Sequence, residues 1–143
     1  MNEDILMPFF GTMMLTVLVW LYMYTKRLGY IATHDVNVES LPTPESLISN
    51  LPDSVNNPSN NLKNLFELPV IFYPLCLYLY LTAQVDQVHV VCAYTFFIGR
   101  CVHSAIQCTI NRVMYRFAFY LLSSLALFVM VIRCFVGLAL EGL

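Results

Sequence analysis

The sequence predicts an all-α membrane protein in which four transmembrane helices form an antiparallel bundle. Of the 143 residues, 59% are hydrophobic and only 11% are charged. Soluble domains carry about 25% charged residues, so this balance indicates a membrane protein. The sequence also contains four apolar runs, each about as long as the ~20 residues that a helix needs to cross the hydrocarbon core.

The apolar runs give the expected spans, which cover about residues 5–24, 65–83, 88–108 and 113–140. Short polar turns join the last three spans, so neighbouring helices are expected to run antiparallel. Pro8 lies in the first turn of its span, where a missing N–H is harmless, whereas Pro74 is expected to kink the second span. Residues 33–62 are rich in Asn, Ser and Pro and predict a long polar loop, with one short helix begun by Pro44.

The distribution of basic residues predicts how this single domain, residues 1–143, is oriented in the membrane. Lys and Arg gather near the first and third connections, whereas the N-terminus and the second connection have none. By the positive-inside rule, the polar loop is cytoplasmic and both termini lie outside the cytoplasm. Arg133, near the outer end of the fourth span, is expected to snorkel to the interface in a structural role. The basic residues that set this orientation are Lys26, Arg27, Lys63, Arg112 and Arg116.

Several classes of function find no support in the sequence. The formal net charge is -2 and no basic cluster is present, which argues against a nucleic-acid partner. The five cysteines fall in apolar runs and none forms a C-x-x-C pair, so neither a disulfide framework nor a metal site is predicted. These cysteines are expected to be small packing residues.

Charged residues inside the spans gather at one predicted depth. At a helical rise of ~1.5 Å per residue, Glu67 and Arg116 lie about one turn inside their spans, His103 about two turns inside and Arg100 one turn deeper. An ionisable group in a span is costly and usually faces a protein interior or a wet cavity. We therefore expect a polar cavity in the cytoplasmic half of the bundle, with a surplus of positive charge that suits an anionic ligand. On the third span the polar residues share one helix face: Arg100, His103, Ser104, Gln107 and Asn111.

Each of these charged residues has two open interpretations. Glu67 and Arg100 either form an internal salt bridge that fixes helix register or face a ligand together. His103 is either a hydrogen-bonded packing histidine or a ligand contact. Arg116 is either an interfacial arginine or part of the site.

The order and spacing of these residues resemble the MAPEG family, the membrane-associated proteins in eicosanoid and glutathione metabolism. The resemblance extends from the first span to the fourth, and it implies a homotrimer of four-helix subunits in the lipid bilayer. It further implies a glutathione site between neighbouring subunits, open to the cytoplasm. The chain is more similar to a bacterial branch than to the eicosanoid synthases, which favours the bacterial inner membrane. Three motifs carry the resemblance: Asn64-x-x-Glu67 followed by Pro69, Arg100-x-x-His103-Ser104, and Arg116 twelve residues after Ser104.

The resemblance implies contacts to glutathione at the start of the second span. Asn64 and Glu67 would bind the glutathione backbone, with Glu67 facing its amino group. Lys63 stands where a basic residue often meets a glutathione carboxylate, and Arg27, at the end of the first span, would be an additional contact. Arg100 would add positive charge to the same cavity.

The resemblance also implies roles on the third and fourth spans. His103 and Gln107 would line the glutathione site, and Arg116 would face the thiol and favour its thiolate. The sequence departs from the family pattern at three positions. Gln107 stands where several family enzymes carry a tyrosine, Phe117 where one branch has a serine, and Asn60 where some members have an arginine.

Three functional hypotheses follow for this chain. The first is a glutathione transferase or peroxidase that acts on a lipophilic small-molecule substrate, using a cationic neighbour to lower the thiol pKa from ~8.5. The second is a non-catalytic member that keeps the pocket or a structural role. The third is a small carrier or proton relay using Glu67 and His103, which is disfavoured because all these charges lie in one leaflet.

Overall fold

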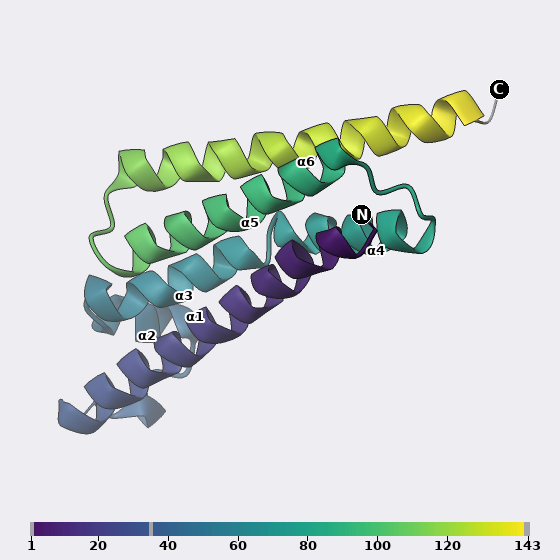
Figure 1. Cartoon of the computed structure of the whole chain (residues 1–143). Helices are drawn as coiled ribbons and strands as arrows, with labels where there is room; N and C mark the ends of the chain where they lie inside the picture. Colours follow the sequence, from purple (N-terminus) through teal and green to yellow (C-terminus); the bar gives the residue numbers. More distant parts are fainter. Residues whose placement is uncertain (1, 35, 142–143) are drawn as a thin grey trace.

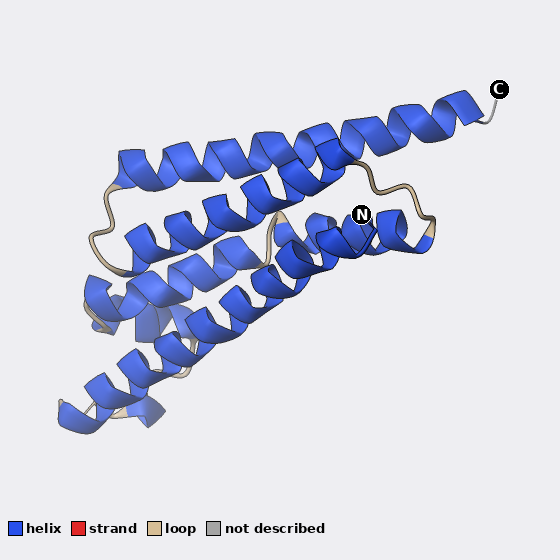
Figure 2. Cartoon of the chain, viewed as in Figure 1, coloured by secondary structure: helices blue, strands red, loops and turns tan. Residues whose placement is uncertain are grey.

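Four long helical segments run side by side in alternating directions in the computed structural model, which describes residues 2–34 and 36–141 (Figure 1). Within these residues the chain forms helices and short connections and no strand (Figure 2). The segments that are long and apolar enough to cross a membrane are Asn2–Thr33, Asp53–Leu81, Gln87–Cys108 and Val113–Leu140. The prediction of an all-α membrane protein with four spans is therefore confirmed.

The third span is the centre of the arrangement. Helix α5 packs against α1, α3 and α6, while α1 also packs against α3 and α4. The start of α1 and the end of α6 lie toward the same end of the bundle, as an even number of spans requires (Figure 1). The element bounds are η1 Asn2–Ile5, α1 Leu6–Thr33, η2 Val38–Ser40, α2 Pro44–Asn50, α3 Asp53–Leu65, α4 Pro69–Leu81, α5 Gln87–Cys108 and α6 Val113–Glu141.

The segment between the first two spans is more helical than its composition indicates. Instead of a polar loop through residues 33–62, the chain forms the expected short helix from Pro44 and then enters α3 at Asp53. Asn56 on α3 holds α2, because its Nδ2 donates to the carbonyls of Ile48 and Leu51, both at 2.8 Å. Half of the buried residues of α3 are polar, and the full set is Val55, Asn56, Pro58, Ser59, Asn61 and Leu65. Asn, Ser and Pro are typical of turns and loops, so the composition of this segment indicates a loop although it forms a helix.

The second span is interrupted next to Glu67. Helix α3 ends at Leu65, residues 66–68 form a turn, and α4 begins at Pro69. Pro69 has no N–H to continue the α3 hydrogen bonding, but it fits the first turn of a new helix. Helix α4 continues through Pro74, so the break in the span lies earlier, at residues 66–68, and the kink at Pro74 stays a prediction.

Helices α5 and α6 approach each other closely at Gly99. A Cβ added there would lie 3.0 Å from the Ser123 Cβ and 3.3 Å from the Phe119 carbonyl oxygen. Glycine therefore allows the two backbones to come together at this point. The contact fixes the polar face of α5 against α6, where Arg116 and Tyr120 lie.

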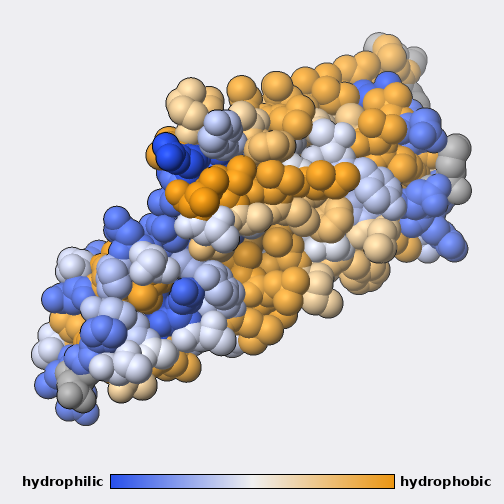
Figure 3. Space-filling view, turned by 60° about the vertical axis from the view of Figure 1, so that its left-hand side comes forward, coloured by the Kyte–Doolittle hydropathy of each residue, from blue (hydrophilic) through white to orange (hydrophobic). Residues whose placement is uncertain are grey.

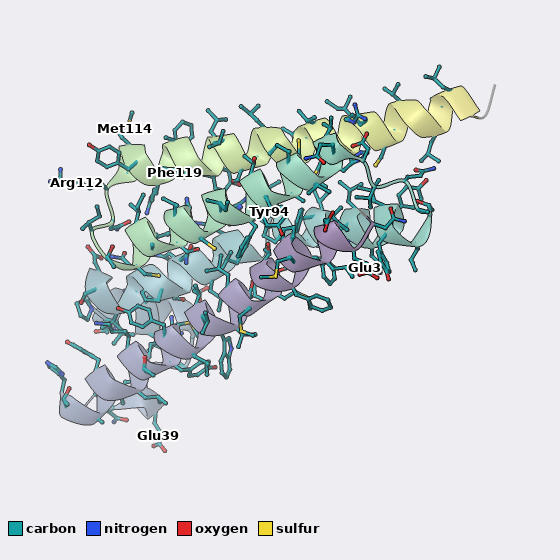
Figure 4. The ribbon with its side chains drawn as sticks, in the orientation of Figure 1. Glu3, Glu39, Tyr94, Arg112, Met114 and Phe119 are labelled. Carbon is teal, nitrogen blue, oxygen red and sulfur yellow. The ribbon has the colours of Figure 1, made fainter. Side chains whose placement is uncertain are left out.

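The surface of the bundle separates into apolar sides and polar ends. Large hydrophobic side chains are exposed along the sides, and hydrophilic residues gather at the end that includes η2 and α2 (Figure 3). Glu3 and Glu39 lie at opposite ends of the molecule, and Arg112 points outward near the α5–α6 turn (Figure 4). This division matches an integral, multi-pass membrane protein whose sides contact lipid. The five cysteines are free.

The turn between α4 and α5 carries a charged contact. Asp86 caps α5 by accepting the backbone N–H of His89 at 2.8 Å, and it also forms an ion pair with Arg133 on α6. Partial burial acts to raise the pKa of Asp86. The hydrogen bond from His89 and the charges of His89 and Arg133 outweigh this effect, so the pKa lies below its ordinary value. Arg133 thus joins α6 to the α4–α5 turn through Asp86, while its snorkelling to the membrane interface stays a prediction.

Candidate functional site

A cavity of about 250 Å³ opens between the second, third and fourth spans. It brings together Glu67, His103 and Arg116, three of the four residues that were predicted to lie at one depth. Its walls combine a carboxylate, a guanidinium, an imidazole and an amide with two apolar side chains and a phenol. The lining residues are Asn64, Glu67, His103, Val113, Arg116, Phe117 and Tyr120.

The interruption of the second span places Glu67 in this cavity. Because α3 ends at Leu65, Glu67 lies in a turn and is exposed rather than packed against a helix face. Its Oε2 accepts a hydrogen bond from the Tyr120 hydroxyl at 3.1 Å. The structure does not pair Glu67 with Arg100; instead the Tyr120 ring lies over the Arg100 guanidinium, with 4.4 Å from Cζ to the ring centroid.

An amide and imidazole network forms the wall beside Glu67. The Nδ1 of His103 lies 2.8 Å from the backbone carbonyl of Arg116, and because a carbonyl only accepts, Nδ1–H is the donor. The Nε2 of His103 lies 2.9 Å from Gln107 Oε1 and 3.3 Å from Asn64 Nδ2, and Asn64 Nδ2 donates to Gln107 Oε1 at 2.9 Å. Four residues from three helices are thereby held together, with His103 and Gln107 buried on the predicted face of α5.

The guanidinium of Arg116 is held from the α5–α6 turn. Its Nη1 donates to Asn111 Oδ1 at 2.6 Å, and Asn111 Nδ2 donates to Asn57 Oδ1 on α3 at 3.1 Å. Asn111 has φ 46°, a left-handed conformation that asparagine tolerates better than most residues. Its backbone N–H donates to the Ile106 carbonyl at 2.7 Å, which fixes the turn. Arg116 is therefore oriented by a chain of contacts that reaches a third helix.

Arg100 lies behind this cavity and has an unusual environment. Its side chain is 0% exposed, one helical turn from His103 on the same face of α5. The guanidinium lies between aromatic rings, 5.3 Å from the Phe96 centroid and 4.4 Å from that of Tyr120. Among the described residues, none accepts a hydrogen bond from its Nε, Nη1 or Nη2.

Four of the expected site residues do not line the cavity: Arg27, Lys63, Arg100 and Gln107. Arg27 donates from Nη2 to Ser59 Oγ at 2.9 Å, which joins α1 to α3. Lys63 is exposed and does not line the cavity. Tyr120 was missed as a site residue, although its spacing of four from Arg116 places both on one helix face. Asn57 was missed because its segment was interpreted as a loop.

The arrangement suits a ligand that carries both charges. A carboxylate projects from the second span and a guanidinium from the fourth, on different walls of one cavity. A ligand with an ammonium group and an anionic group can therefore bind both at once. Glutathione has this chemistry, with an ammonium group, two carboxylates and a thiol, so the residues present fit it.

Comparison with known proteins identifies the family. The model of the MAPEG family matches residues 5–136, a range that includes nearly all of the four spans and every residue lining the cavity. Neither a curated protein nor a solved structure matched the chain in the other two comparisons. Because the match covers most of the sequence, this chain belongs to the MAPEG family, whose members are membrane proteins of glutathione and eicosanoid metabolism.

Proposed function

We propose that this protein binds glutathione in the cavity and uses it as a transferase or peroxidase on lipophilic electrophiles. The observation that carries the proposal is the placement of Glu67 and Arg116 on different walls of the same cavity. Glu67 would face the glutathione ammonium group. Arg116 would face the thiol, where a fixed positive charge favours the thiolate. Family membership supports the same ligand class.

The residues around Arg116 would prepare the site for this chemistry. When bound, glutathione would supply the thiolate that attacks the electrophile. The contact from Asn111 keeps the guanidinium oriented, so little reorganisation is needed when negative charge develops on sulfur. A lipophilic substrate would reach the site from the bilayer, past the apolar side chains of Val113 and Phe117.

The proposed assembly is a homotrimer, with the glutathione site between neighbouring subunits. Arg27 and Lys63 do not line the cavity of their own subunit. In a trimer, the same residues of a neighbouring subunit could reach this cavity. The proposed location is the bacterial inner membrane, with both termini outside the cytoplasm. Native mass spectrometry in several mild detergents should give a trimer. A monomer in all of them would remove the shared site from the proposal.

The ligand is tested most directly at Glu67. Glu67→Gln keeps the shape but removes the charge, so glutathione affinity should fall by about 10- to 100-fold, as expected when a charged hydrogen bond is lost. Calorimetry on the detergent-purified protein measures this change. Glu39→Gln is the matched control, because Glu39 is exposed on η2 at one end of the molecule (Figure 4). Equal affinity in the wild type and Glu67→Gln would remove Glu67 from the ligand site.

A non-catalytic glutathione-binding protein is the second candidate. The observation in its favour is Phe117, which lines the cavity next to Arg116 and offers no hydroxyl to the thiol. A turnover assay with a lipophilic electrophile separates the two candidates. Binding of glutathione without turnover, and without an ultraviolet thiolate signal, would establish the non-catalytic function.

A further inference from the structure

Arg100 presents a buried charge for which the described residues provide no hydrogen-bond acceptor. All three guanidinium nitrogens lack one, although the side chain is 0% exposed. A guanidinium does not give up its proton in proteins, so the charge persists when it is buried. The contacts with the Phe96 and Tyr120 rings recover part of the lost hydration through cation–π attraction. They do not replace hydrogen bonds, so the guanidinium remains able to bind an anion.

Among the described residues, Tyr120 both contacts this guanidinium and lines the cavity. One face of its ring lies against Arg100, and its hydroxyl donates to Glu67 at the cavity wall. Tyr120 itself lines the cavity, as does His103 one turn along α5 from Arg100. A rotation of the Tyr120 side chain would therefore open the guanidinium to whatever the cavity holds.

We propose that Arg100 is an occluded binding site for a carboxylate of the ligand and that Tyr120 is a movable cover over it. The inference rests on the proposed function in one respect, since it takes the carboxylate to belong to glutathione. In the closed state Tyr120 bonds to Glu67 and shields Arg100. In the open state Tyr120 leaves both, Glu67 becomes available to the ligand ammonium, and Arg100 binds a carboxylate. One side chain thus controls both ends of a zwitterionic ligand.

The substitution Arg100→Met distinguishes this role from a structural one, because the two roles predict opposite changes in the Tm of the ligand-free protein. If Arg100 is an unpaired buried charge, an apolar side chain of similar length should raise the Tm of the ligand-free protein by a few degrees. The same change should lower affinity for carboxylate ligands by at least about tenfold. If Arg100 instead holds the bundle together, the ligand-free Tm should fall. Arg133→Met is the control, because Arg133 has Asp86 as its partner at the other end of α5.

The cover is tested by Tyr120→Phe. This change keeps the ring over Arg100 and removes only the hydroxyl that bonds to Glu67. The closed state loses one hydrogen bond, so carboxylate affinity should rise by about fivefold. Unchanged or weaker binding in Tyr120→Phe would overturn the cover.

Two probes separate this inference from the proposed function. Glutathione tests both, and glutarate, a dicarboxylate without ammonium or thiol, tests the anion site alone. In one outcome, glutarate stabilises the wild type but not Arg100→Met, and glutathione has no effect on either protein. This result would support the anion site and refute the proposed function. Stabilisation of both proteins to the same degree by both probes would refute the anion site and leave glutathione binding in place. No response of the wild type to either probe would overturn both.

Discussion

Substitutions of Asn111 test whether the α5–α6 turn orients Arg116 for chemistry. The side chain makes a charge-assisted hydrogen bond to Arg116 at 2.6 Å and a neutral one to Asn57 at 3.1 Å. Such bonds contribute about 1.5–3 and 0.5–1.5 kcal/mol, so removing both should cost about 2–4 kcal/mol of unfolding free energy. Asn111→Ala should cost about 1 kcal/mol more than Asn111→Gly, because alanine is strained at φ 46° and glycine is not.

The functional readout is the thiol of bound glutathione. In Asn111→Gly the turn can keep its backbone conformation while Arg116 loses its anchor. The apparent pKa of the bound thiol should then rise toward the ordinary value of about 8.5, measured from the ultraviolet thiolate absorbance as a function of pH. Asn56→Ala is the control, because it removes two hydrogen bonds that hold α2 and leaves the Arg116 contacts intact. It should lower stability without moving the thiol pKa.

A specific pair of results would refute this reasoning. If Asn111→Gly and Asn56→Ala lower the Tm equally and neither changes the pKa of the bound thiol, Asn111 only stabilises the turn. If Asn111→Gly and Asn111→Ala are equally stable, the left-handed backbone is not the source of the expected difference.

Other contacts give equally direct tests. Arg116→Leu should keep most glutathione binding and lose about 100-fold in turnover together with the thiolate absorbance; unchanged absorbance would exclude its role. Gly99→Val should lower the Tm far more than Gly137→Val, because a Cβ at Gly99 would meet close neighbours on α6 whereas one at Gly137 would meet nothing within 4 Å. The lowered pKa of Asp86 means that its interaction stabilises the fold above the unfolded pKa of about 3.9 and is lost as pH falls through the folded value. In Asp86→Asn, the unfolding free energy should therefore fall less steeply as the pH drops below about 4. The difference from the wild type should be at most about 1 kcal/mol, because the pair with Arg133 is exposed.

The spans and the polar face of α5 could be predicted because each depends on one helix alone. An apolar run of sufficient length identifies a membrane helix whatever it packs against. Likewise, the spacing of Arg100, His103, Ser104 and Gln107 places them on one face, and the structure buries all four. The same depth argument brought Glu67, His103 and Arg116 to one cavity.

The features that were missed depend on pairs of helices. The typical loop residues of α3 include Asn56, Asn57 and Asn61. Each is buried or half-buried, and its amide makes a hydrogen bond to a partner on another segment. The salt bridge between Glu67 and Arg100, one of the two interpretations that the sequence leaves open, is absent among the described residues for a similar reason. Their opposite charges suggest a pair, but the Tyr120 side chain contacts both of them. The position of Tyr120 depends on how α6 packs against α5, which no local pattern in the sequence reveals.

The interruption at residues 66–68 also has a consequence for the membrane itself. Helix α4 has 13 residues, which at ~1.5 Å each extend about 20 Å, well short of the ~30 Å hydrocarbon core. The rest of this crossing must use the turn and the end of α3, whose free backbone groups need protein or water around them. Water and lipid headgroups should therefore reach into the bilayer beside this segment of the protein. A water-soluble tripeptide and an oil-soluble substrate could then meet at this depth without either one crossing the membrane.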